Sequence, residues 1–372
     1  MKKFLALAMT LVMAISLFPT AMAWDETANM SAVLEYTETI DLLQTIEESD
    51  SSAYEKGREV MLSLGIPAEL IDDMDKSHVE SYAGGTAAVT TTQYVRVRYY
   101  LSDESNEANS VAGLAKANNL FVEVSEDDIS NLASTFEIID KETFEYESQI
   151  VKAMQEQIQN PLQDTARPMT LTQPELVFNG YLELKSMATK KANGRYLLSG
   201  RYEWKTDPQG FALGVRKDIF TIAPDKTGDF IDDTEYAISK AQSINGTMNG
   251  TGTWSYTYKN HNKEYKGYNN MDHGDAGFGI NVPIYYSINT TNRFAKYHSY
   301  MGYVSGEMIP SSSSTTNMKI CVSYAKNKTR YSVGISVGIP KSASISITPS
   351  TYHDKPVRAS LMFTHPSFEQ IN

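Results

Sequence analysis

The spacing of apolar residues changes along the chain from a helical period to a strand period. Between residues 53 and 83, apolar side chains recur three and four positions apart, and Gly65-Ile66-Pro67 interrupts the pattern. Glycine is favoured just past a helix end and proline at the start of the next helix, so this stretch predicts short, packed helices. The run from Phe144 to Ile158 carries one apolar stripe and predicts a longer helix. Residues Gln93 to Leu101 alternate instead, which predicts one half-buried strand.

The last of the short helices has a candidate start signal. Ser77 is followed three residues later by Glu80, the spacing of a capping box, in which each residue satisfies a backbone N–H of the other. His78 lies in the same turn, and a lone histidine there is expected at the surface or in a helix cap.

Beyond residue 168, short strand-like runs recur between turn residues. This part of the chain is rich in tyrosine, threonine, serine, asparagine and glycine. The predicted strands are Leu176–Lys185, Tyr196–Trp204, Asp218–Ile222, Thr253–Tyr258, Gly279–Ile284, Tyr300–Glu307, Met318–Tyr324, Tyr331–Ile339 and Ala343–Thr348. Many short strands without long intervening helices predict an antiparallel sandwich or a barrel-like fold.

Charge divides the chain at the same place. Residues 24–168 contain 29 acidic and 9 basic side chains, whereas residues 169–372 contain 16 acidic and 22 basic ones. Residues 160–168 hold two prolines and little apolar content, which is typical of a linker. The sequence therefore predicts an α+β protein, with an acidic, mainly helical region at 24–159, a linker at 160–168, and an all-β, antiparallel, sandwich-like domain at 169–372. The opposite charges also suggest that the acidic region masks a basic binding surface of the second part.

The first residues have the pattern of an export signal. Two lysines precede an apolar run from Phe4 to Phe18, and the small-x-small motif Ala21-Met22-Ala23 follows, so residues 1–23 are predicted to be a cleaved signal peptide. The run is shorter than the roughly 20 residues that span a bilayer, and no later segment is apolar enough to do so. We expect a secreted or extracellular protein, associated with the cell wall or free. A lone cysteine, Cys321, excludes a disulfide framework and is expected to be a small buried side chain.

Two glycine- and aromatic-containing segments carry a resemblance. Gly200-Arg201-Tyr202-Glu203-Trp204 and Gly277-Phe278-Gly279-Ile280-Asn281-Val282-Pro283 are similar to segments of uncharacterised exported proteins of Gram-positive bacteria. The resemblance implies no known activity.

An aromatic and amide-rich tract is the candidate ligand-binding site. Its aromatic members are Trp254, Tyr256, Tyr258, Tyr265 and Tyr268. The first three alternate, so they share one face of a strand, and several asparagines between and beyond them supply paired donors and acceptors. If that face is open, it resembles a platform for sugars or peptide, whereas aromatic residues in a sheet also form cores.

Clustered carboxylates and histidines offer candidate metal sites. Asp225, Asp229, Asp232 and Asp233 lie in one short stretch and could hold calcium, which takes about six to eight oxygen ligands, although their spacing is not that of an EF-hand. A transition-metal hydrolase would need His261, His273 and His298 to converge. No other cofactor is expected.

One motif matches a serine-hydrolase signature. Gly334-Ile335-Ser336-Val337-Gly338 fits G-x-S-x-G, and Asp354 and His365 follow in a suitable order. That motif requires a sharp turn from strand to helix, whereas Ser336 lies within a strict alternation that ends at Pro340. The sequence context therefore argues against a triad.

The same region could form an amphipathic hairpin. From Ser332 to Thr348, aliphatic residues alternate with serine, glycine and threonine around Pro340-Lys341. This pattern is typical of an inserting hairpin of a pore-forming toxin, but also of an ordinary hairpin with one buried face. Each half is shorter than the about 9 to 11 residues that cross a bilayer.

Together these patterns favour an exported, non-catalytic protein that binds a glycan or an anionic polymer of the cell wall. The alternatives are a membrane-active β-hairpin protein and a secreted metal-dependent hydrolase. Specific nucleic-acid binding is not expected, because the formal net charge of the chain is −12.

Overall fold

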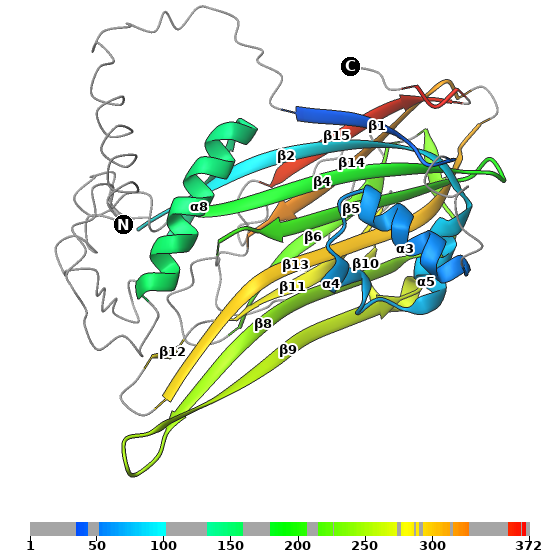
Figure 1. Ribbon diagram of the computed structural model, residues 1–372. Coiled ribbons are helices and arrows are strands. Elements are labelled where there is room, and N and C mark those ends of the chain that lie inside the picture. Colours follow the sequence, from blue (N-terminus) through cyan, green and yellow to red (C-terminus); the bar gives the residue numbers. More distant parts are fainter. Residues whose placement is uncertain are drawn as a thin grey trace, which may run out of the picture. The chain divides into compact units, whose positions relative to one another are not determined.

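The computed structural model describes residues 35–43, 52–101, 132–158, 179–206, 215–225, 227–273, 277–285, 288–289, 293–312, 315–326, 356–365 and 367–369. These residues form a mostly antiparallel β structure with few helices (Figure 1). The strands are β1 (Glu35–Asp41), β2 (Gly85–Leu101), β3 (Leu132–Ile139), β4 (Gly180–Lys191), β5 (Tyr196–Trp204), β6 (Val215–Pro224), β7 (Gly228–Phe230), β8 (Tyr236–Met248), β9 (Trp254–Lys266), β10 (Asp272–His273), β11 (Phe278–Tyr285), β12 (Ile288–Asn289), β13 (Arg293–Pro310), β14 (Asn317–Ala325) and β15 (Val357–Thr364). The helices are α3 (Ala53–Ser63), α4 (Ala68–Ile71), α5 (Lys76–Glu80) and α8 (Lys141–Ile158), with short 3₁₀ turns η1 (Ser81–Gly84) and η3 (Tyr268–Asn270).

The described strands belong to two sheets. Sheet A has the order β1-β2-β4-β5-β13-β8-β9, with β3 also paired to β2 and with β7 and β12 paired to β13. Sheet B has the order β10-β11-β6-β14-β15. Because the pairings are antiparallel and the two sheets pack face to face, the sandwich-like part of the prediction is confirmed.

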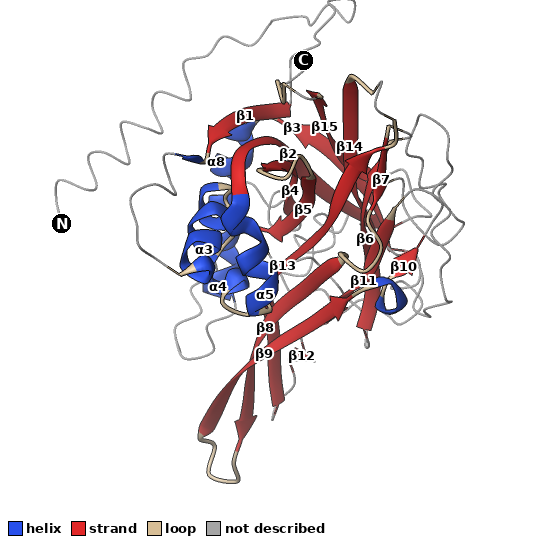
Figure 2. Cartoon of the chain, turned by 90° about the vertical axis from the view of Figure 1, so that its right-hand side faces the viewer, coloured by secondary structure: helices blue, strands red, loops and turns tan. Residues whose placement is uncertain are grey.

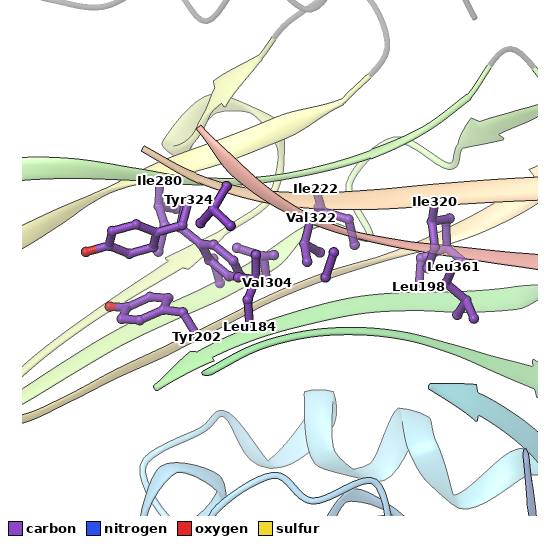
Figure 3. Packing of buried hydrophobic residues seen from close by; sticks show 14 of the residues in the cluster. Leu184, Leu198, Tyr202, Ile222, Ile280, Val304, Ile320, Val322, Tyr324 and Leu361 are labelled. Carbon is purple, nitrogen blue, oxygen red and sulfur yellow. The ribbon is translucent and has the colours of Figure 1, made fainter. Parts of the chain in front are cut away.

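The main core lies between the two sheets. Strand β15 shows the expected alternation, since every second residue from Val357 to Phe363 is buried. In Figure 3 side chains of sheet A, such as Leu184 and Val304, point toward those of sheet B, such as Val322. Each fully buried aliphatic side chain contributes about 1.5–3 kcal/mol relative to an exposed one, so this layer is the chief source of stability.

A second core lies on the opposite face of sheet A, under the short helices. Val60 of α3 and Leu70 of α4 are fully buried against sheet residues such as Met187 and Ile238. Figure 2 shows α3, α4 and α5 on one side of sheet A and the strands of sheet B on the other. Sheet A is therefore the middle of three layers, and its helix-covered surface is called the helix side below.

Side-chain caps and backbone conformation set the ends of the short helices. Helix α3 has a capping box, in which Ser52 accepts from the backbone of Glu55 and the Glu55 carboxylate accepts from Ser52 N. Gly65 follows the helix with φ of 78°, a left-handed conformation that costs glycine little. The predicted box at Ser77 is wrong: Asp75 caps α5 and accepts from Ser77 N at 2.8 Å.

Helix α8 is fastened to the helix side of sheet A by charge and by aromatic rings. Arg96 of β2 donates two hydrogen bonds of 2.8 Å to the Glu147 carboxylate, and the Tyr181 hydroxyl donates to the same carboxylate at 2.7 Å. Phe144 packs beside Tyr94 with ring centroids 4.8 Å apart. Two-pronged arginine–carboxylate pairing fixes orientation as well as distance, so α8 has a defined place on the sheet.

Sheet A joins sequence from both sides of the predicted linker. Strand β2 pairs with β4 from Gly85–Lys191 to Val97–Gly180, although the linker lies between them in sequence. The linker itself, the predicted signal peptide and the segment Ser332–Thr348 lie outside the described residues. Cys321 is buried in β14, as predicted. Within the described part of the chain, every helix is too short or too polar to cross a membrane.

Candidate functional site

A cavity of about 460 Å³ opens on the helix side of sheet A between α4 and α8. In Figure 1 strands β5, β13 and β8 are visible between these two helices. The lining residues that matter for chemistry are Glu69 of α4, Lys152 of α8, Lys205 after β5, Ile244 of β8, and Lys296, His298 and Ser299 of β13. We call this cavity the lysine pocket.

An irregularity in β13 shapes the floor of the pocket. The register of β13 with β8 shifts between His298 and Met301, which is a β-bulge. Ser299 within it has φ of 55°, a conformation that is uncommon for a residue other than glycine and costs about 1–3 kcal/mol. Because of the extra residue, Lys296 and His298 before the bulge and Met301 after it all line the pocket. Bulges of this kind are frequent beside binding sites, where they redirect a side chain.

Positive charges converge on His298. Burial lowers the pKa of its imidazole, and the ammonium groups of Lys296 and Lys152 lower it further, so the ring is held neutral. Its Nδ1 shares a hydrogen bond of 2.8 Å with Ser299 Oγ. A bound anion at this point would face two lysines and a histidine that becomes easier to protonate.

The carboxylates of Glu203, which lines the pocket, and of Glu183, which lines a neighbouring cavity, are already engaged. The Arg201 guanidinium, only 5% exposed, donates to both Glu183 and Glu203. Lys205 Nζ lies 3.3 Å from Glu183 and 2.6 Å from Glu203. Burial alone would raise the pKa of Glu203, but Arg201 and Lys205 outweigh it and the pKa falls below its ordinary value. The two positive and two negative charges of these four groups therefore balance one another.

The rim at α4 is fixed by a lysine of β8. Lys240 Nζ donates to the backbone oxygen of Glu69 at 2.7 Å and to Asp73 Oδ2 at 2.5 Å. The Lys240 side chain is only 4% exposed, so the ion pair is largely shielded from water. This contact holds Glu69 at the mouth of the pocket.

The predicted aromatic tract falls mainly on β9, next to this pocket, and its members have different environments. Tyr258 is 76% exposed, Tyr256 is half-buried, and Tyr265 is buried in the core between the sheets, where its hydroxyl donates to Asn281 O at 3.2 Å. The side chains of Trp254 and Tyr268 lie outside the described ones.

Strand pairing connects the tract to the pocket. Lys296 of β13 is opposite Ile244 of β8, and Ile244 is opposite Tyr258 of β9. Directly opposite residues of antiparallel strands share a face, so these three side chains form a row across the helix side of sheet A. The next row is His298, Gln242 and Asn260. The pocket therefore continues onto an open surface with one aromatic ring and two amides.

The predicted metal ligands do not form a described cluster. Asp225 Oδ1 accepts from Thr227 N at 2.9 Å, and Asp232 and Asp233 are exposed in a turn after β7, in which Asp229 lies. Across the described residues, no three histidine, cysteine or acidic side chains are grouped as a metal site requires.

Of the three candidate hydrolase residues, one lies in the described part of the chain. Ser336 and Asp354 lie outside the described residues. His365 is described, and its Nδ1 shares a hydrogen bond of 2.6 Å with the Tyr196 hydroxyl.

His78 occupies an environment that sequence reasoning did not anticipate. Its ring stacks on Tyr236 with centroids 3.8 Å apart, and its Nε2 lies 3.3 Å from Ser305 Oγ and 3.4 Å from Tyr303 OH. Burial lowers the pKa of His78 to about 3. The expectation of a surface or capping histidine is wrong, because α5 lies directly against the sheet and presses the ring onto Tyr236.

The lysine pocket itself was missed by sequence reasoning. Lys152 and Lys296 are 144 positions apart, and neither belongs to a motif. His298 was noticed only as a candidate metal ligand. The sequence is matched by no protein-family model, and a search of curated proteins likewise gives no match.

Proposed function

We propose that this is an exported, non-catalytic binding protein that holds a glycan or an anionic polymer of the cell envelope in the lysine pocket and along the adjoining face of β9. The observation that carries the proposal is the row Lys296, Ile244 and Tyr258, which joins a positively charged pocket to an exposed aromatic ring.

The chemistry of that row suits a charged carbohydrate-like chain. Neighbouring strands are about 4.8 Å apart, so the row extends about 10 Å from the lysine to the tyrosine. Lysine ammonium groups attract an anion, a tyrosine face packs against the C–H surface of a sugar or polyol, and the amides of Gln242 and Asn260 hydrogen-bond hydroxyl groups. Helices α4 and α8 of the acidic region form the walls.

Charge favours an anionic ligand over a neutral one. The acidic groups Glu183 and Glu203 are paired with Arg201 and Lys205, and the ammonium groups of Lys152 and Lys296 lie close enough to His298 to lower its pKa. In a partly enclosed site such charges act more strongly than at an open surface.

The test is co-sedimentation of the mature chain, residues 24–372, with wall sacculi over a salt series. We expect binding that weakens with salt, and a loss of about tenfold in Lys296→Gln, which corresponds to about 1.4 kcal/mol. Tyr258→Ala should weaken binding without lowering stability. The matched control is Lys263→Gln, an exposed lysine on the opposite face of β9.

Two results would contradict the proposal. Equal binding by Lys296→Gln and Lys263→Gln would mean that the pocket is not the site. Turnover of the polymer instead of simple binding would replace a binding protein by a hydrolase, with Ser299 and His298 as the first residues to substitute.

A second function, membrane insertion, is favoured by one observation. Strands β14 and β15 pair antiparallel from Asn317–Thr364 to Tyr324–Val357, so the sequence between them, with the amphipathic alternation of residues 332–348, connects two adjacent strands. Dye release from anionic liposomes by the mature chain would support this function, and intact liposomes at every pH from 4 to 8 (about the range that titrates histidine and carboxylates) would remove it.

A further inference from the structure

The lysine pocket has a neighbour with which it shares two side chains. A second cavity, of about 280 Å³, lies between α8 and sheet A and is lined by Tyr94, Phe144, Ser148 and Gln149 among others. Lys152 and Lys205 line both cavities. A group bound at these two lysines therefore borders both cavities.

The two shared lysines are in different states. Lys205 is held by Glu183 and Glu203 and is fixed in place. Lys152 is exposed on α8, and among the described residues no carboxylate lies within 4.0 Å of its ammonium group. Lys152 is thus the charge at the junction that remains available to an incoming anion.

The second cavity is chemically different from the first. It has two aromatic rings, Tyr94 and Phe144, with the hydroxyl of Ser148 and the amide of Gln149, and its lining also includes the acidic residues Glu145 and Glu183. Rings, neutral hydrogen-bonding groups and carboxylates that accept from hydroxyl groups suit a hydroxyl-bearing, uncharged unit such as a polyol or a sugar. In the lysine pocket, the row Lys296, Ile244 and Tyr258 is available to the second unit attached to the anion.

An anion at such a junction must carry two substituents. A phosphate monoester carries one substituent, and so does the carboxylate of a uronic acid, which projects from its ring as a side group. A phosphodiester carries its charge within the chain and a unit on each side of it. Of these three groups, the phosphodiester is the one whose charged atoms themselves join two units, which suits a lysine that lines both cavities.

We infer that the ligand is a phosphodiester-linked polymer of polyols or sugars, with one phosphate at Lys152 and a neighbouring unit in each cavity. This inference rests on the proposed binding function, and it specifies the ligand class.

Titration calorimetry of the mature chain with three probes tests it: a glycerol-phosphate oligomer joined by phosphodiesters, glycerol 3-phosphate, and an oligogalacturonate of matched charge. We expect the phosphodiester oligomer to bind at least about tenfold more tightly than the other two. Lys152→Gln should remove most of that preference, whereas Lys76→Gln, another exposed helix lysine, should not change it.

A variant in the second cavity tests whether that cavity contributes to binding in addition to the charge of the lysines. Gln149→Ala should weaken binding of the oligomer by about threefold to tenfold and binding of glycerol 3-phosphate by less, because the single glycerol of the monoester can occupy the other cavity instead. Equal or tighter binding of the oligogalacturonate would overturn the inference and leave the proposed function intact. If none of the probes binds while the chain still sediments with sacculi, the inference fails and the proposed function stands; if sacculi are not bound either, both fail.

Discussion

The attachment of α4 to sheet A can be tested at Lys240. Its side chain is 4% exposed, and its ammonium group bridges the Glu69 carbonyl and the Asp73 carboxylate at 2.7 and 2.5 Å. Lys240→Met keeps the apolar stem but removes the charge and its donors. Breaking a buried pair by removing one partner costs about 3–5 kcal/mol, and because the Asp73 side chain is 25% exposed, we expect a loss at the lower end, about 3 kcal/mol.

The assay is urea unfolding of the mature chain at pH 7, followed by the fluorescence of tryptophan, including the buried Trp204. Asp73→Asn and the double variant complete a cycle, in which the double variant should lose about 2 kcal/mol less than the sum of the single ones. Lys76→Met is the control. Lys76 Nζ lies 3.5 Å from Glu80 Oε1, and the Lys76 side chain is 74% exposed, so this ion pair contributes at most about 0.5 kcal/mol. A loss below about 1 kcal/mol in Lys240→Met, or strict additivity in the cycle, would refute the reasoning.

Three further outcomes are expected. Gly57→Ala should destabilise the protein by about 1–3 kcal/mol in the same urea assay, because the new Cβ would overlap a backbone carbonyl of α5, whereas Gly84→Ala, where a Cβ meets open space, should change little. Tyr265→Phe should cost about 1 kcal/mol, since the carbonyl of β11 that accepts its hydroxyl loses that partner. The pKa of His298 lies below its ordinary value of 6.5, so the unfolded chain binds more protons and the free protein loses stability as pH falls below that value. A bound anion favours the charged imidazole, so the affinity for an anionic ligand, measured by calorimetry, should rise as pH falls over the same range. His298→Gln should abolish that rise. An affinity that does not change with pH in the parent protein would exclude His298 from the site.

Several strands with a buried face were indicated by the sequence, whereas β8 (Tyr236–Met248) was not predicted. Tyr196–Trp204 was predicted and observed with the same limits, and Met318–Tyr324 extends by one residue at each end in β14. Prediction failed at β9, where only Thr253–Tyr258 was expected and the strand runs on to Lys266. The added residues are mostly polar and exposed because, within the described part of sheet A, β9 pairs only with β8, so their pattern carries no hydrophobic signal.

The architecture could not be read from strand positions alone. Residues on both sides of the predicted linker pair in sheet A, because β2 lies beside β4, and pairing of distant strands has no local signature. Charge gave a partial indication: Asp73 and Asp75 of the acidic region pair with Lys240 and Lys266 of the basic part.

The candidate site was predicted only in part. Tyr258 was selected because aromatic residues alternate around it, and it is exposed beside the pocket. Tyr265 was selected as a member of the same aromatic tract, although it is a core residue, since composition cannot distinguish the two faces of a strand. The lysines come from α8 and β13, and only tertiary structure places them together.

The position of β13 has a consequence for the order in which the molecule can form. Arg293–Pro310 lies in the middle of sheet A, between β5 and β8, although it is among the last strands in sequence. Until that segment is available, β5 and β8 each present an open edge, and such edges readily recruit other chains. Closing the sheet depends on contacts between distant residues, which form slowly. The sheet can therefore close only after most of the chain has been synthesised, and a chain cut short before Arg293 should aggregate instead of folding.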